Sequence, residues 1–157
     1  LNRLSRECDV VTIDFENVPS SALKFLENKV DVHPNSKAVE LCQDRLKEKK
    51  LFEECKIPVT KYNKIDNIDS LRISKESFTN GSILKSRFFG YDGKNQVDMD
   101  ITDLKTAFKA CGGNKLIIEE KVSFIKELSL IGARDKKGRT AFYPLVENNP
   151  YERDFAY

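Results

Sequence analysis

This sequence lacks the features that mark several common classes of protein. No apolar run approaches the roughly 20 residues that a membrane-spanning helix needs. The 157 residues include four widely separated cysteines, with no C-x-x-C pair, and a single histidine, so the ligand spacing of a zinc site is missing. Scattered cysteines and the lack of a recognisable secretory signal peptide are typical of a reducing compartment. We therefore predict a cytoplasmic chain with no membrane partner.

A dominant charge of one sign is also missing. Lys and Arg total 27 against 25 Asp and Glu, and the two signs are interspersed. A dedicated nucleic-acid surface would need a basic stripe with interleaved aromatic residues, so we predict no nucleic-acid partner. The G-x-x-x-x-G-K-[ST] loop of P-loop enzymes is absent as well. The length is sufficient for one sizeable hydrophobic core.

One segment, residues 83–96, carries the strongest functional signal: I-L-K-S-R-F-F-G-Y-D-G-K-N-Q. A short apolar run leads to Lys85, which can reach an anion as a point charge. Gly90 and Gly93 flank a turn in which successive N–H groups can point at an anion. These residues predict a nucleotide triphosphate site. A hairpin turn beside a surface lysine is the simpler interpretation of the loop alone.

The hydrophobic pattern predicts alternating helices and strands. Ser20 or Ser21 is expected to cap the first helix and Thr102 the last. The predicted strands are Val10–Asp14, Val30–Val32, Ser82–Ser86, Asn95–Met99, Leu116–Glu120, Leu128–Arg134 and Arg139–Val146, with a turn at Asp135–Gly138 between the last two. The predicted helices run from Ser20 to about Asn28, from Asn35 or Ser36 to Cys42, from about Asp44 to Cys55, over Asn67–Glu76, and from Thr102 to about Ala110.

Six motifs follow one another in an order typical of one family. They are D-V-V-T-I-D-F-E-N-V-P at 9–19, Q-D-R at 43–45, I-L-K-S-R at 83–87, G-Y-D-G-K at 90–94, K-E-L-S-L-I-G-A-R at 126–134 and Y-P-L-V-E-N at 143–148. With these motifs the chain resembles, over nearly its whole length, the N5-carboxyaminoimidazole ribonucleotide synthetases (phosphoribosylaminoimidazole carboxylase ATPase subunits). These are ATP-grasp enzymes of purine biosynthesis.

The resemblance implies an α/β (α+β) chain with a partial ATP-grasp fold. Residues 1–34 would be the end of an N-terminal Rossmann-like pre-ATP-grasp domain. Residues 35–157 would be an ATP-grasp domain with its lid and hinge but an incomplete C-terminal part. In the family, the magnesium-binding carboxylates follow Y-P-L-V-E-N. We therefore expect a fragment that shows little bicarbonate-dependent ATPase activity by itself. We also expect it to self-associate, because the strand Val10–Asp14 would present unpaired backbone edges and an apolar face without upstream strands.

The implied activity is ATP-dependent carboxylation of 5-aminoimidazole ribonucleotide. Bicarbonate attacks the γ-phosphate of ATP to give carboxyphosphate and ADP. The carboxyl group then passes to the amine, which releases phosphate and gives N5-carboxyaminoimidazole ribonucleotide. The implied cofactors are ATP and Mg²⁺, and the implied assembly is a homodimer. Two alternatives stay open: another ATP-grasp ligase, such as a glycinamide ribonucleotide ligase or transformylase or biotin carboxylase, and a non-catalytic nucleotide-binding fragment.

The resemblance also implies roles for individual residues, with no metal ligand among them. The backbone of residues 119–122 would meet the adenine edge, and Glu127 would accept hydrogen bonds from the ribose hydroxyls. The implied catalytic residues are Lys85, Tyr91, Asp92 and Lys94. The implied substrate-binding residues are Glu16, Tyr91, Asp92 and Lys94. The implied ATP-binding residues are Arg45, Lys85, Gly90, Tyr91, Asp92, Gly93, Lys94, Asn95, Gln96, Glu119, Glu120, Lys121, Val122 and Glu127.

Several of these side chains also have a plainer interpretation. Lys85 would suit a strand-end surface lysine, and Arg45 a helix cap or a surface ion pair. Glu127 would suit a solvated carboxylate, Asp92 a turn-forming residue and Glu16 a capping acid. The residue types alone do not decide between these interpretations and the functional ones.

Two positions depart from the family's usual loop, which runs G-G-Y-D-G-[RK]-G-Q. In this chain Phe89 and Asn95 replace two of its glycines. Asn tolerates a positive φ better than most residues, so Asn95 can keep the backbone shape, whereas a positive φ at Phe89 would be costly.

Overall fold

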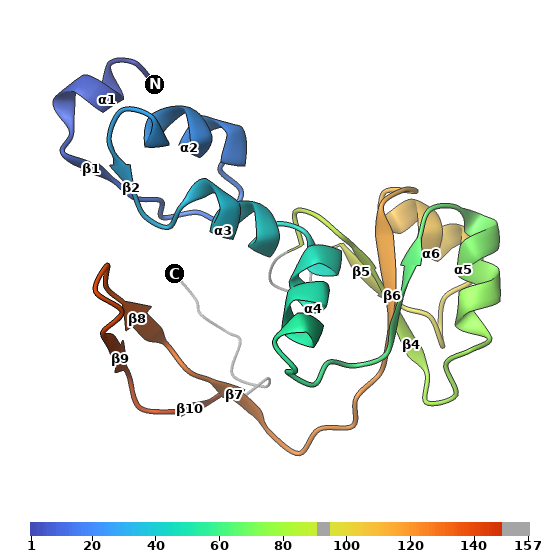
Figure 1. Ribbon diagram of the computed structural model, residues 1–157. Coiled ribbons are helices and arrows are strands. Elements are labelled where there is room, and N and C mark those ends of the chain that lie inside the picture. Colours follow the sequence, from blue (N-terminus) through green and yellow to red (C-terminus); the bar gives the residue numbers. More distant parts are fainter. Residues whose placement is uncertain (91–94, 149–157) are drawn as a thin grey trace, which may run out of the picture. The chain divides into compact units, whose positions relative to one another are not determined.

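Figure 1 shows the computed structural model of the chain, which describes residues 1–90 and 95–148. The chain divides into two compact units, Leu1–Lys121 and Val122–Tyr157. Across the described residues, no helix combines the length and the apolar character that a membrane span requires.

The first part of the larger unit is a small layer of helices beside a parallel pair of strands. The predicted strand over residues 10–14 is shorter than expected, because β1 pairs with a single short partner, β2. Val11 faces the core, whereas Val10 is 57% exposed. The elements are α1 (Leu4–Glu7), β1 (Val10–Val11), α2 (Ser20–Glu27), β2 (Asp31–Val32) and α3 (Ser36–Cys42). The buried core of this part consists of Val11, Leu23, Leu26, Val32 and Val39.

Side-chain caps begin several of the helices. Asn35 accepts the Ala38 N–H at 2.8 Å and begins α3, as one of the two predicted caps. Asp103, not the predicted Thr102, caps α6, because its carboxylate accepts two backbone N–H groups of the first turn. The predicted serine cap of α2 is also wrong, since that helix begins directly after Pro19 with no side-chain cap.

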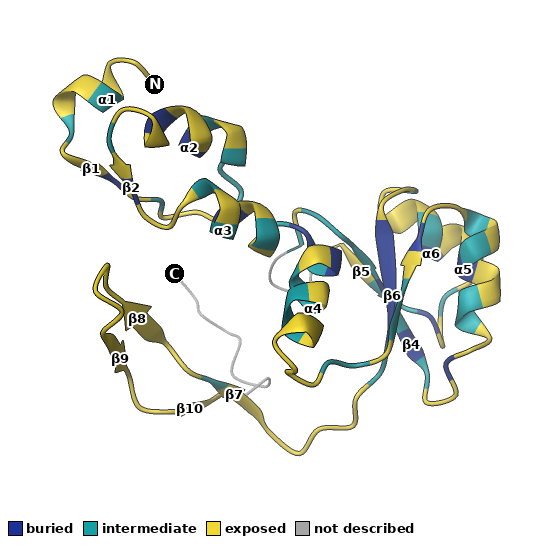
Figure 2. Ribbon diagram, in the orientation of Figure 1, coloured by how far each residue is buried: buried dark blue, intermediate teal, exposed yellow. Residues whose placement is uncertain are grey.

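A four-stranded antiparallel sheet, in the order β3-β6-β4-β5, forms the centre of the larger unit. In this register, Lys85 lies opposite Ile117 on one side and Gln96 on the other. Strand β6 has neighbours on both edges, which explains why most of it is buried (Figure 2). The strands are β3 (Tyr62–Ile65), β4 (Ser82–Ser86), β5 (Gln96–Asp98) and β6 (Leu116–Glu120).

The two faces of this sheet differ because side chains alternate along each strand. Leu84 and Ile118 point to the face on which α5 (Ile68–Lys75) and α6 (Leu104–Ala110) pack, and they join the main apolar core there. Lys85 and Glu119, one residue along each strand, therefore point to the opposite face. Helix α4 (Arg45–Glu54) contributes residues to this second face, as the ion pairs below show.

The smaller unit contains two antiparallel strand pairs, β7 with β10 and β8 with β9. The predicted strands over 128–134 and 139–146 are each broken, because the inner pair forms a hairpin while the outer segments pair separately. The predicted turn at Asp135–Gly138 is confirmed, with the Gly138 N–H donating to the Asp135 carbonyl at 3.0 Å. The strands are β7 (Glu127–Ser129), β8 (Gly132–Arg134), β9 (Thr140–Phe142) and β10 (Val146–Asn148).

Candidate functional site

The Q-D-R motif lies at the junction of α3 and α4, and each of its side chains makes a different contact. Gln43 donates from Nε2 to the backbone carbonyls of Glu16, at 2.6 Å, and Val18, at 2.7 Å. A side-chain amide that bonds two carbonyls of one loop fixes the course of that loop. Gln43 therefore positions the segment that carries Glu16, the predicted substrate carboxylate.

Asp44, the second residue of the motif, is buried and pairs with Arg87, the residue that directly follows β4. Its carboxylate accepts the Leu46 N–H at 3.0 Å, which caps α4, and binds both Nε (2.9 Å) and Nη2 of Arg87. Burial alone would raise the pKa of Asp44, but the hydrogen bonds from Arg87 and from the helix backbone hold that pKa below its ordinary value. The ionised carboxylate thus joins α4 to the segment that follows β4.

Arg45, the third residue of the motif, contacts the segment from Phe89 to Asn95, which we call the glycine loop. Its Nη2 donates to the Gly90 carbonyl at 3.1 Å, and its backbone N–H donates to the Arg87 carbonyl at 3.1 Å. A Cβ on Gly90 would lie 2.6 Å from Arg45 Nη2, so any larger residue would displace the guanidinium. Within the described residues, Arg45 therefore lies at the loop and does not cap its helix.

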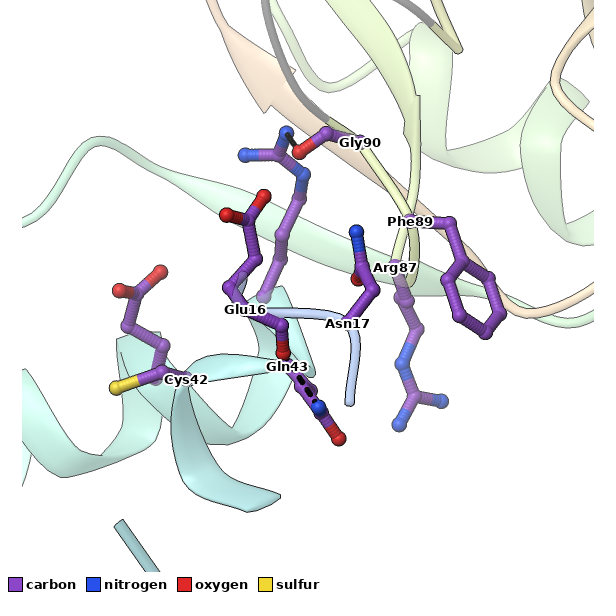
Figure 3. Close-up of a pocket in the computed structure, with 9 residues that line it drawn as sticks. Glu16, Asn17, Cys42, Gln43, Arg87, Phe89 and Gly90 are labelled. Atoms are coloured by element: carbon purple, nitrogen blue, oxygen red, sulfur yellow. Dashed lines mark hydrogen bonds between the residues drawn. The ribbon is translucent and has the colours of Figure 1, made fainter. Parts of the chain in front are cut away.

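Gln43 and Arg45 border a pocket of about 210 Å³ (Figure 3). The Glu16 segment and the start of α4 form one side, and the chain from Arg87 to Gly90 forms the other. The lining mixes two arginines with two glutamates, so it suits a ligand that carries both anionic and hydrogen-bond-donating groups. The lining residues are Glu16, Asn17, Cys42, Gln43, Arg45, Glu48, Arg87, Phe89 and Gly90.

A second polar cluster occupies the sheet face opposite α5 and α6. Lys85 Nζ donates to Glu119 Oε2 at 3.0 Å, and Lys49 Nζ from α4 lies 3.4 Å from the same oxygen. All three side chains are largely buried, with exposed fractions of 19% for Lys85, 14% for Lys49 and 9% for Glu119. Lys85 is therefore not a surface lysine, and the simpler interpretation of that residue is wrong.

The glycine loop begins and ends with residues in the left-handed region. Phe89 has φ +56° and Asn95 has φ +57°, at the two positions where the resembled family carries glycine. Asn95 behaves as predicted, and its Nδ2 donates to the Phe89 carbonyl at 3.1 Å, which closes the base of the loop. The positive φ at Phe89 departs from that residue's preference and is a strained conformation of the kind that clusters at functional sites. Tyr91, Asp92, Gly93 and Lys94 lie outside the described residues.

Strand β6 ends at the predicted hinge. The Glu120 N–H donates to the Lys61 carbonyl at 2.9 Å, and the Lys121 N–H donates to the Gly81 carbonyl at 3.1 Å. The Lys121 side chain is turned to β5 and beyond, where its Nζ binds Asp98 at 2.7 Å and Asp100 at 2.6 Å. Hydrogen bonds to Asp100 and Asp98 raise the pKa of Lys121. Among the described residues, the Lys121 carbonyl and the Val122 N–H have no hydrogen-bond partner.

In the smaller unit, Glu127 is exposed at the start of β7 and is hydrogen-bonded by Asn148, the last residue of the motif at 143–148. Asn148 Nδ2 donates to Glu127 Oε1 at 2.9 Å and to Ser129 Oγ at 2.7 Å. The two residues lie opposite each other in the β7–β10 pair. Asn148 thus orients the carboxylate predicted to accept the ribose hydroxyls.

The sequence of this chain matches the models of two known domain families. The ATP-grasp domain model matches residues 50–157, and the ribonucleotide synthetase preATP-grasp domain model matches residues 1–43. The chain belongs to the ATP-grasp family. The predicted ATP-grasp fold with a preceding pre-ATP-grasp part is therefore confirmed, and so is the resemblance on which that prediction rested.

Named ATP-grasp relatives agree with this membership. The chain is 36% identical to the N5-carboxyaminoimidazole ribonucleotide synthase of Pseudomonas aeruginosa and 38% identical to that of Brucella melitensis, each over 94% of its length. It matches a crystal structure of the Staphylococcus aureus N5-carboxyaminoimidazole synthetase complexed with ADP at a TM-score of 0.87 and 33% identity, over 94% of this chain and 40% of that one. The chain spans 41% and 42% of the lengths of the Pseudomonas and Brucella proteins.

Several residues that make contacts at this candidate site could not be predicted from the sequence. Asp44 and Arg87 belong to the quoted motifs, but nothing local indicated that they pair with each other. Asn148 ends the motif at 143–148, and nothing in that motif indicates its contact with Glu127. Lys49 lies in a lysine-rich helix where no spacing distinguishes it from its neighbours.

Proposed function

We propose that this chain carries the nucleotide-binding region of an N5-carboxyaminoimidazole ribonucleotide synthetase. The whole protein would use ATP and bicarbonate to carboxylate the amine of 5-aminoimidazole ribonucleotide, with ADP and phosphate as the other products. The observation that carries the proposal is the meeting of Arg45 with Gly90, across 45 residues of sequence. Two positions predicted to serve the nucleotide thus come together at the loop that should cover its phosphates.

The phosphate contacts are proposed for Lys85 and Arg45. Phosphoryl transfer depends mostly on positioning and on electrostatic stabilisation of the transferred group. Lys85 lies on a strand of the central sheet and is therefore rigidly placed, with one ammonium available to oppose the α- and β-phosphates. Arg45 would add a second cation beside the loop, where Gly90, Gly93, Asn95 and Gln96 are proposed to supply backbone donors.

The adenine contacts are proposed for the end of β6. The backbone of Glu119 is paired with strands on both sides within the sheet, and the Glu120 N–H donates to the Lys61 carbonyl. Within the described part of the chain, the Lys121 carbonyl and the Val122 N–H are the groups left to bind a base edge, the first as acceptor and the second as donor. Glu127, oriented by Asn148, is proposed to accept hydrogen bonds from the ribose.

The ribonucleotide would bind next to the loop, in the pocket that Glu16 lines. Its phosphate and hydroxyl groups suit a lining with both arginines and glutamates. Tyr91, Asp92 and Lys94 are proposed to complete this substrate side and to act in the carboxylation step. This assignment rests on the family motif, because these three residues lie outside the described residues.

Magnesium is proposed to arrive bound to the nucleotide phosphates, as is usual for Mg²⁺ in ATP-dependent sites. No group of three or more His, Cys, Asp or Glu side chains suited to a metal gathers in residues 1–90 and 95–148. We therefore assign no protein ligand to the metal and derive no step through it. A homodimer in the cytoplasm is the proposed setting of the whole protein.

The proposed activity has a direct assay. Full-length protein should release phosphate from ATP in the presence of bicarbonate and form N5-carboxyaminoimidazole ribonucleotide when 5-aminoimidazole ribonucleotide is added. Phosphate release that needs a different amine, such as phosphoribosylamine with glycine, would favour the alternative of another ATP-grasp ligase, in this case a glycinamide ribonucleotide ligase. Nucleotide binding without turnover under every condition would favour a non-catalytic role.

Base selectivity provides a test of the hinge. Adenine offers an amino donor where guanine offers a carbonyl acceptor, so guanine would place an acceptor against the Lys121 carbonyl. A site built to hydrogen-bond one base discriminates strongly against the other. We expect calorimetric titration of the full-length protein to show ATP and ADP bound at least about tenfold more tightly than GTP. Equal affinities for ATP and GTP would overturn the hinge assignment.

A further inference from the structure

The cluster around Glu119 holds one more cation than a simple ion pair needs. Glu119 Oε2 contacts the ammonium groups of both Lys85, at 3.0 Å, and Lys49, at 3.4 Å. The two lysines come from different elements, Lys85 from β4 and Lys49 from the second turn of α4. The sheet and α4 therefore share a single carboxylate, and the three side chains together carry a net charge of +1.

Lys49 is held in this place from two sides. Its Nζ lies 5.5 Å from the centroid of the Tyr62 ring, in addition to its contact with Glu119. Tyr62 is the residue directly opposite Glu119 in the β3–β6 pair, and its hydroxyl donates to Glu53 Oε2 at 2.9 Å. The aromatic face and the carboxylate both attract an ammonium. Lys49 is thus an integral member of the cluster.

A nucleotide would have to compete with Glu119 for Lys85. If Lys85 were the only partner of Glu119, its move to a phosphate would leave a largely buried carboxylate unpaired, and an unpaired buried charge is strongly unfavourable. The same carboxylate would also repel the phosphate. A second lysine on Glu119 removes both penalties, because Glu119 keeps a partner when Lys85 turns to the nucleotide.

We propose that Lys49 is a positioning residue of the nucleotide site, which neutralises Glu119 so that Lys85 is available to the phosphates. The inference rests on the proposed function, since it assumes that Lys85 binds an adenine nucleotide. It assigns Lys49 no contact with the nucleotide itself. Lys49 acts through Glu119, and its effect should therefore depend on the charge of Glu119.

Calorimetric titration of the full-length protein with ADP tests this role. Lys49→Ala should weaken ADP binding by about tenfold or more, whereas Lys49→Arg should stay close to wild type because it keeps the cation. Lys47→Ala is the matched control. Lys47 lies on the same helix and pairs with Glu40, but both side chains of that pair are exposed, so its loss should leave ADP affinity unchanged.

A double variant separates this role from a merely structural one. In Lys49→Ala/Glu119→Gln the neutral amide no longer sequesters Lys85, so ADP affinity should recover toward that of the Glu119→Gln single variant. Steady-state kinetics should show the Lys49→Ala defect mainly in KM for ATP. Unchanged ADP affinity in Lys49→Ala, or a double variant as weak as Lys49→Ala, would overturn the inference. Failure of the wild-type protein to bind ADP would instead count against the proposed function.

Discussion

Replacing Lys85 with alanine should lower turnover of the full-length enzyme by about a hundredfold or more. Preorganised charges that stabilise a transition state are commonly worth this much when a single one is removed. Lys85 is fixed on a central strand, largely buried, and paired with Glu119, so solvent cannot substitute for it easily. Single-turnover phosphate release, measured at saturating ATP, would isolate the chemical step from binding.

Lys64→Ala provides the control for this first experiment. Lys64 lies on β3 of the same sheet and pairs with Asp66 at 2.8 Å, but its side chain is 49% exposed. Loss of an exposed ion pair has little energetic effect, so this variant should keep the turnover of wild type. Near-normal turnover in Lys85→Ala would show that the lysine only supports the sheet.

The second large effect concerns stability. Asp44→Ala should lower the free energy of unfolding of the full-length protein by about 3–5 kcal/mol, because it leaves the largely buried Arg87 guanidinium without its partner. The change also removes the N-cap of α4, which adds to the loss. Asp44→Asn should be less damaging, since asparagine caps helices well but cannot pair with Arg87. Urea unfolding of the three proteins would measure the order.

The same pair predicts a pH dependence. The folded-state pKa of Asp44 lies below its ordinary value, so the pair contributes stability fully above the unfolded pKa of about 3.9. That contribution is lost as pH falls through the folded pKa, when the carboxylate is protonated. The stability advantage of wild type over Asp44→Asn should therefore be full at neutral pH and shrink below about pH 4. An advantage that stays constant through this range would mean that the Arg87 pair contributes little.

The prediction from sequence was strongest where the signal was local. The strand that carries Lys85 spans residues 82–86, as predicted, and β6 spans residues 116–120, also as predicted. Both are short apolar runs between turn residues, and burial on a central sheet is what such runs favour. The strand at 62–65 was missed because it is polar, with only Ile65 buried. It is an edge strand, and its place depends on β6, which the local pattern cannot indicate.

The family and the order of its two parts could be predicted from the sequence alone, because motifs and hydrophobic periodicity are local properties of the chain. Which charged side chains pair with each other depends on the tertiary structure. Asp44 pairs with Arg87, which lies 43 residues further along the chain, and Lys85 pairs with Glu119, which lies 34 residues further along. Strand register sets the second pair, and the packing of α4 against the sheet sets both the first pair and the place of Lys49. Neither register nor packing can be predicted from the residues adjacent to any one of these side chains, since both depend on contacts between elements that are far apart in the sequence.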